Sequence, residues 1–204
     1  MSDTVQYPKL RLGTAPDSWG VWNPSGDPLQ TPWTRYLDEA RAAGYAYSEL
    51  GPFGYLPTDP GIVREEYARR GLTLTGGTVF VALHKGPQAL EQARADCDAE
   101  MAVIGPSGAR HVVILPEGYT DFDGRLVASP VLTDDEWRAL TSGMSELGRY
   151  LADRHDAVLV FHTHADSHVG TQEEIERFLD NTDPDTVKLC LDTGHVAYCG
   201  ADNL

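Results

Sequence analysis

Residues 157–195 read AVLVFHTHADSHVGTQEEIERFLDNTDPDTVKLCLDTGH, and they contain one complete strand–helix–strand unit. The apolar runs at residues 157–161 and 187–191 predict strands, because they are rich in large or β-branched apolar side chains and are bounded by polar residues. Between them, Thr171 and Glu174 have the spacing of a capping box, which predicts the start of a helix. This order predicts two parallel strands that are joined by a helical crossover.

The same alternation runs through the rest of the chain. Further strands are expected at residues 10–13, 47–50, 72–80 and 111–115. Helices are expected to begin at Thr31-Pro32, with Thr31 as the N-cap, at Asp59-Pro60, near Pro87 and at a Thr133/Glu136 capping box, and a sixth helix near residue 201. Polar and aromatic groups follow the strand ends in the stretches APDSWGVW (15–22), ELGPFGY (49–55), GGTVF (76–80), PEGY (116–119), HTHADSH (162–168) and DTGH (192–195).

The position of these stretches separates two α/β architectures. An open doubly wound sheet gathers its ligand contacts at one switch point, whereas a (β/α)8 TIM-type barrel builds its site from the loops after all of its strands. No G-x-G-x-x-G follows the first strand, which further disfavours a dinucleotide fold. We therefore predict one TIM-type barrel domain over residues 1–204. Because about six of the eight strands are found, the barrel is expected to be truncated after about strand six, without its C-terminal quarter.

Composition excludes several classes of protein. The 204 residues are 41 % hydrophobic and 23 % charged, as in an ordinary globular domain, and no apolar run is long enough to cross a membrane. Sixteen basic against 31 acidic residues give a net charge of −15, which disfavours nucleic acid and anionic membranes as partners. Three cysteines are too few for a disulfide framework, so we expect a reducing, cytoplasmic location.

The densest group of metal-binding side chains ends the strand at residues 157–161. His162 and His164 are two residues apart, so both are expected on one face of the strand. Asp192 ends the next strand, and neighbouring strands lie about 4.8 Å apart. Imidazole and carboxylate groups are common ligands of divalent ions, so His162, His164 and Asp192 are a candidate metal site. The alternative is that the histidines bond loop backbone and that Asp192 caps a following helix.

The stretches APDSWGVW, ELGPFGYLPTDP, FHTH and LDTGH together resemble the xylose-isomerase-like TIM-barrel superfamily, and most closely its inosose dehydratase branch of sugar (phosphate) isomerases and epimerases. The resemblance implies a divalent ion (Mn, Co, Zn or Mg) at the mouth of the barrel, with Asp192 as a ligand. It implies that His195 contacts substrate and takes part in catalysis. The epimerases usually carry a Glu where this chain has His162, and their two later ligands have no counterpart in these residues.

Other candidates also follow strand ends; they are Trp19, Trp22, Glu49, His84, Glu117 and His168. The tryptophans are candidates for an apolar wall against a sugar, although packing would explain them equally well. Glu49 is a candidate catalytic acid or base, with a structural salt bridge as the alternative. His84 and His168 are candidate substrate contacts, and so is Glu117. His155 and Asp156 lie in a helix-to-strand turn and receive no role.

These residues and the resemblance predict a metal-dependent enzyme that acts on a keto-sugar or keto-cyclitol through a metal-stabilised enediolate. Isomerisation, epimerisation and dehydration stay open, and His162 in place of Glu favours inosose-type dehydration. An abasic-site endonuclease-like phosphodiesterase and a non-catalytic sugar-binding relic are the alternatives. The expected partner is a small sugar or cyclitol, with a homo-oligomer possible through open sheet edges, and the 204 residues alone are expected to lack turnover.

Overall fold

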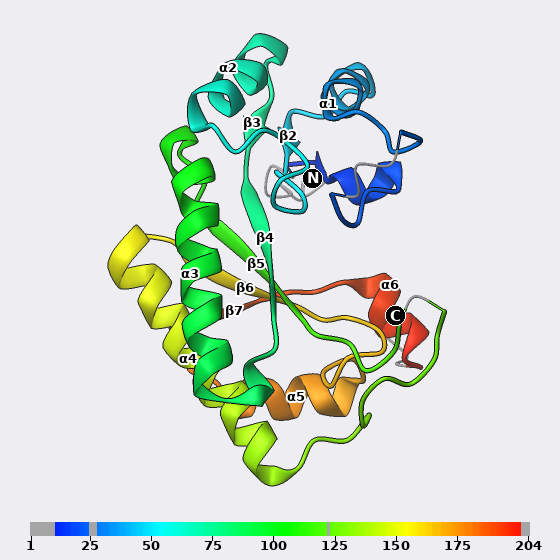
Figure 1. Ribbon diagram of the computed structural model, residues 1–204, viewed down its shortest axis with the longest axis vertical. Helices are drawn as coiled ribbons and strands as arrows, with labels where there is room; N and C mark the ends of the chain where they lie inside the picture. Colours follow the sequence, from blue (N-terminus) through cyan, green and yellow to red (C-terminus); the bar gives the residue numbers. More distant parts are fainter. Residues whose placement is uncertain (1–10, 25–27, 122, 201–204) are drawn as a thin grey trace, which may run out of the picture.

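The computed structural model describes residues 11–24, 28–121 and 123–200 (Figure 1). The strands are β1 (Gly13–Thr14), β2 (Tyr47–Ser48), β3 (Thr73–Leu74), β4 (Gly76–Val81), β5 (His111–Pro116), β6 (Val158–His162) and β7 (Val187–Cys190). The helices are α1 (Trp33–Ala42), α2 (Pro60–Arg70), α3 (Pro87–Ile104), α4 (Asp134–His155), α5 (Gln172–Asp180) and α6 (Thr193–Tyr198), with shorter 3-10 turns η1 (Pro16–Trp19), η2 (Leu83–Lys85) and η3 (Gly105–Ser107).

All strand pairs are parallel, in the orders β1-β2-β3 and β4-β5-β6-β7. The single strand that the sequence predicts at residues 72–80 is two strands, β3 and β4, on either side of Thr75. The chain that follows β2 runs beside both strands. The Leu50 amide donates to the Gly76 carbonyl at 2.9 Å, and Pro52 bridges Thr78. The two sheets therefore continue into one another.

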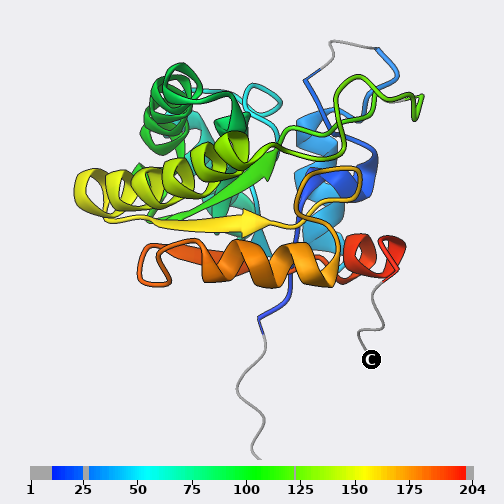
Figure 2. The ribbon, with the colours of Figure 1, turned by 90° about the horizontal axis from the view of Figure 1, so that it is seen from below.

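The strands lie side by side in chain order with no reversal, which is the order of a barrel rather than of a doubly wound sheet. The helices follow the same order outside the strands, since α1 contacts α2, α2 contacts α3 and α3 contacts α4. Figure 2 shows α3 and α4 along one side of the strands and α5 beneath β6. The prediction of a TIM-type architecture is confirmed.

Local sequence signals set the helix ends. Asp59 accepts from the amides of Gly61 and Ile62, and both expected capping boxes form at the starts of α4 and α5. α1 begins at Trp33 without a side-chain cap, so the expected role of Thr31 is wrong. A sixth helix was expected only near residue 201, whereas α6 begins at Thr193.

The two faces of the sheet differ in burial. Ile114 and Phe161 are paired and fully buried, and Phe161 stacks on Phe178 of α5 at 4.2 Å between ring centroids. Because side chains alternate along a strand, the neighbouring residues face the other way, toward the inner side. There Phe80 is 53 % and Val158 38 % exposed. The core of the described residues thus lies between strands and helices. In these residues no helix is long and apolar enough to cross a membrane.

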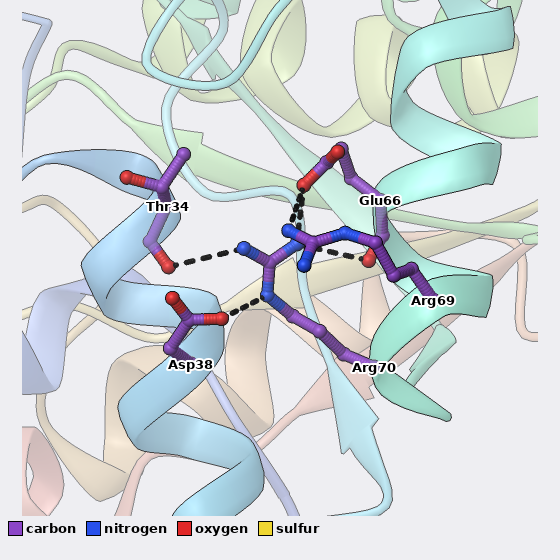
Figure 3. Close-up of polar contacts among 5 residues, drawn as sticks. All are labelled: Thr34, Asp38, Glu66, Arg69 and Arg70. Atoms are coloured by element: carbon purple, nitrogen blue, oxygen red, sulfur yellow. Dashed lines mark hydrogen bonds and ion pairs between the residues drawn. The ribbon is translucent and has the colours of Figure 1, made fainter.

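A buried arginine joins α1 to α2 (Figure 3). The Arg70 guanidinium, with its side chain only 5 % exposed, donates to Asp38 of α1 at 2.6 Å and also pairs with Glu66 one turn earlier. A further nitrogen of Arg70 reaches the Thr34 carbonyl at 3.4 Å. Arg69 pairs with the same Glu66 at 2.8 Å but is 56 % exposed. Arg70 is therefore the cation that connects the two helices.

Candidate functional site

Asp192 ends β7, and its two carboxylate oxygens have different neighbours. Oδ1 accepts the His195 amide at 2.9 Å, so Asp192 caps α6, as the structural alternative foresaw. Oδ2 lies 3.9 Å from Nε2 of His162 and 3.9 Å from Nε2 of His195. Burial raises the pKa of Asp192, but the His195 amide and the two imidazoles lower it further, so the pKa lies below its ordinary value. The carboxylate is ionised and directed at two imidazoles.

His162, His195 and Asp192 have the geometry of a metal centre. One ligand atom of each lies within 4.8 Å of the others. Metal–ligand bonds of about 2.0–2.2 Å place two ligand atoms about 3 to 4.4 Å apart, so the two separations from Asp192 suit a shared ion. Burial lowers the pKa of His162 to about 4 and also lowers the pKa of His195, so both rings are neutral at neutral pH and offer a lone pair. The donor set fits a divalent ion.

His164 lies beside this group rather than within it. Its ring centroid is 5.8 Å from that of His162 and 4.0 Å from that of His195. Its Nδ1 lies 2.6 Å from the Ala165 carbonyl, and donation there leaves the lone pair on Nε2. The structure therefore brings all four predicted residues together but places His195, expected as a substrate contact, among the ligand atoms. The cause is local, because Asp192 caps α6 and the residue three positions later returns to its side.

Glu49 follows β2 and lines a cavity of about 240 Å³. The other lining residues are Thr75, Gly76, His111, Val113, Val160, Leu189 and Cys190. Burial raises the pKa of Glu49 to about 7, and the charge of Asp17 adds to the shift. Cys190 is paired in register with His162, so the cavity adjoins the strand ends that carry the metal-type ligands. Asp17 is a site residue that sequence reasoning missed.

Trp19 is held against α1. Its indole Nε1 donates to Glu39 at 2.7 Å, and its ring meets the Tyr36 ring edge-on at 4.9 Å. This anchoring is the packing alternative foreseen for Trp19, and it leaves only the ring for a ligand. Trp22 is 61 % exposed.

His84 and His168 form a second group with Glu117. Their ring centroids are 5.1 Å apart, and Nε2 of His84 lies 3.6 Å from Oε2 of Glu117. His168 bonds the Ser129 carbonyl through Nε2 at 3.0 Å. Lys85 pairs with Glu117 at 2.5 Å and is a further residue that sequence reasoning did not single out.

Two loops of the mouth are joined to each other. The loop after β6 bonds the loop after β5, since Gly118 bridges Ser167 and the Tyr119 amide donates to the Asp166 carbonyl at 2.8 Å. Asp166 has φ 56°, a left-handed backbone conformation that is uncommon outside glycine. No sequence pattern indicated this contact.

His155 lies at the end of α4, on the amino-terminal side of the strands. It pairs with Asp98 at 2.7 Å, and Asp98 also accepts from Tyr150 and Arg154.

Comparisons with known proteins give the family. An inosose dehydratase of Geobacillus thermodenitrificans is 28 % identical over 201 residues, which are 96 % of this chain; the chain spans 65 % of that relative. Among solved structures, the probable 3-DHS dehydratase of Bacillus anthracis has a TM-score of 0.70 at 15 % identity, covering 95 % of this chain and 66 % of its own. The IOLI protein with a binding zinc atom has a TM-score of 0.69 at 17 % identity, with coverage of 95 % and 66 %. A family profile matches residues 37–204, and the chain belongs to the xylose isomerase-like TIM barrel family.

Proposed function

We propose that this chain is part of a divalent-metal-dependent enzyme that processes a keto-sugar or keto-cyclitol, with inosose-type dehydration as the favoured reaction. The observation that carries the proposal is the convergence of His162, Asp192 and His195 on one point at the ends of β6 and β7. The relative named inosose dehydratase and the zinc-containing structural neighbour support it.

His162, Asp192 and His195 would hold the ion. His164 would help to orient His195, because the two imidazole rings are in contact. The ion, when bound, supplies a Lewis acid that polarises a carbonyl and favours negative charge on its oxygen. Because His162 and His195 are neutral at neutral pH, no proton competes with the ion for the lone pairs of these two rings.

Glu49 is the proposed proton-transferring residue. A pKa near 7 lets one carboxyl group take a proton from carbon and return it at neutral pH. Cys190 lines the same cavity as Glu49 and is paired in register with His162, which supports a base near the proposed ion. Return of the proton to another carbon would give isomerisation, return to the other face epimerisation, and loss of a neighbouring hydroxyl dehydration.

Trp19, His84 and His168 are proposed to contact the remainder of the substrate. Each follows a strand end at the same side of the sheet, and the ring of Trp19 is held by Glu39. His84 follows β4 and His168 follows β6.

Isotope exchange tests this proposal. The protein is incubated in D2O with an inosose and Mg²⁺ or Zn²⁺, and NMR follows deuterium entering the carbon next to the carbonyl. Exchange needs only an ion and one base, both of which this chain would supply. We expect metal-dependent exchange that falls at least 100-fold in Glu49→Gln and stays unchanged in Glu65→Gln, a matched change on α2. An exchange rate that is the same without added metal and in Glu49→Gln would contradict the proposal.

A further inference from the structure

Glu117 directly follows β5 and pairs with Lys85, which lies in the turn after the neighbouring strand β4. The Glu117 amide donates to the Val81 carbonyl at 2.8 Å, which fixes the chain after β5 beside the end of β4. Ile114 and Phe161 are paired and face the helices, so strand alternation places Glu117 and His162 on the opposite, inner face. Glu117 thus lies one strand away from the proposed metal centre.

The Lys85–Glu117 pair is partly exposed and partly packed against other side chains. Oε2 of Glu117 accepts from Lys85 Nζ at 2.5 Å, and the two side chains are 44 % and 56 % exposed. His84, with 11 % of its side chain exposed, lies behind Glu117 and contacts the ring of His168. The Tyr119 ring also contacts His168, with 5.7 Å between the ring centroids. The aromatic rings lie beside the pair, while both of its charged side chains stay partly exposed.

The charges at and around the Lys85–Glu117 pair limit the class of ligand that could bind there. Burial, followed by His168, lowers the pKa of His84, so this imidazole is neutral at neutral pH. The pair itself sums to zero charge. The sequence has three lysines, of which Lys188 lies within β7 and Lys9 lies outside the described residues. Lys85 is therefore the lysine that follows a strand end in the described residues, and Glu117 already neutralises it. A neutral ligand suits this setting better than a phosphate does.

We propose that Lys85 and Glu117 form a subsite that binds two adjacent hydroxyl groups of an uncharged polyol, on the side of the mouth away from Asp192. The carboxylate accepts one hydroxyl proton, and the ammonium group donates to the oxygen of the neighbouring hydroxyl. An isolated exposed ion pair contributes little to stability, so stability gives little reason for its placement here. The inference rests on the proposed function and names the part of the substrate that lies beyond the ion.

Binding of an unreactive cyclitol tests the subsite. myo-Inositol is the probe, titration calorimetry or saturation-transfer NMR is the readout, and cyclohexanol, which has no adjacent hydroxyl pair, is the ligand control. We expect Lys85→Met and Glu117→Gln each to weaken myo-inositol binding at least tenfold. The double variant should lose little more than the worse single variant, because the two groups act as one unit. Lys188→Met and Glu65→Gln are the matched controls and should bind as the wild type does.

Unchanged affinity in both subsite variants would overturn the inference, and so would a wild-type protein that does not bind myo-inositol. Tighter binding of an inositol monophosphate than of myo-inositol would overturn the uncharged class. Binding of Mn²⁺ by the same samples is a separate readout of the proposed metal centre and of correct folding. A protein that binds Mn²⁺ but not myo-inositol removes the subsite and leaves the proposed function standing.

Discussion

Oδ2 of Asp166 accepts a hydrogen bond from Thr120 Oγ1 at 3.2 Å, and this contact joins the loop that carries His164 and His168 to the loop after β5. A second bond, from the Tyr119 amide to the Asp166 carbonyl, lies next to it. The side chain of Asp166 therefore serves the site in two ways: its carboxylate holds the neighbouring loop, and its residue type tolerates the left-handed backbone between the two histidines.

Replacing Asp166 separates these two roles. Asp166→Asn keeps an acceptor oxygen and tolerance of positive φ, so we expect unfolding free energy close to that of the wild type. Asp166→Ala loses both and should cost about 1–2 kcal/mol. Urea unfolding measures the cost, and imidazole NMR shifts report the histidines. Asp156, with φ 51° at the end of α4, is the control: Asp156→Ala carries similar strain but should leave the shifts of His164 and His168 unchanged. Equal shifts in both alanine variants would show that the contact does not act on the histidines.

Glu49 should titrate far above an ordinary glutamate. We expect a midpoint near 7 rather than near 4.5, because burial disfavours its charged form. Asp17→Asn removes a neighbouring negative charge and should lower the midpoint, whereas Asp134→Asn at the exposed start of α4 should not. NMR of 13C-labelled glutamate, with Glu49→Gln to assign the signal, measures this directly. A midpoint at the ordinary value would remove Glu49 as a base at neutral pH.

Glu100 should make stability depend on pH. Its side chain is fully buried, neither carboxylate oxygen has a hydrogen-bond partner, and burial raises its pKa to about 8. The folded state thus holds this proton more tightly than the unfolded state does. Its contribution is complete below about pH 4.5 and is lost as the pH rises toward 8.

The comparison variant for this effect is Glu100→Gln, which cannot ionise. Over that pH window, the unfolding free energy of the wild type should fall relative to Glu100→Gln by up to about 1.4 kcal/mol per pH unit. Glu65→Gln, at an exposed position, should give a curve parallel to the wild type. Parallel curves for all three proteins would show that Glu100 is not buried as described.

Arg70 and Arg69 offer a matched pair of substitutions, because both pair with Glu66 but only Arg70 is buried. Arg70→Met should cost about 2 kcal/mol, since it leaves the Thr34 carbonyl and Asp38 without their cation. Arg69→Met should change stability by less than about 0.5 kcal/mol. Chemical denaturation compares them, and equal costs would contradict the bracing role of Arg70.

Much of the fold follows from local patterns in the sequence. The capping boxes at Thr133 and Thr171 and the Asp59-Pro60 start were predicted correctly, because a cap is an interaction between residues two or three apart. The bend at Thr75 was not predicted, since the β-branched and large apolar residues within 72–80 indicate a single strand and the bend depends on pairing with the chain after β2. The barrel assignment succeeded because polar groups follow most of the strands.

The site was predictable to the extent that its residues lie on strand ends. His162, His164, Asp192 and His195 were all found this way. The place of His195 among the ligand atoms depends on the helical turn after Asp192, which the D-x-x-H spacing signals once a helix start is recognised. Contacts between distant segments left no trace in the sequence; the Trp19–Glu39 and Thr120–Asp166 hydrogen bonds are of this kind, and so is the effect of Asp17 on the pKa of Glu49.

Titration of the protein with Mn²⁺ or Zn²⁺ tests the proposed metal centre most directly. We expect one divalent ion per chain, with affinity that falls at least tenfold in His162→Ala, in His195→Ala and in Asp192→Asn, which keeps the helix cap but loses the charge. His155→Ala is the control and should bind as the wild type does. It removes an imidazole at the C-terminal end of α4, where His155 pairs with Asp98 of α3. A protein that binds no ion, or whose affinity is the same in all four variants, would contradict the metal centre and the function built on it.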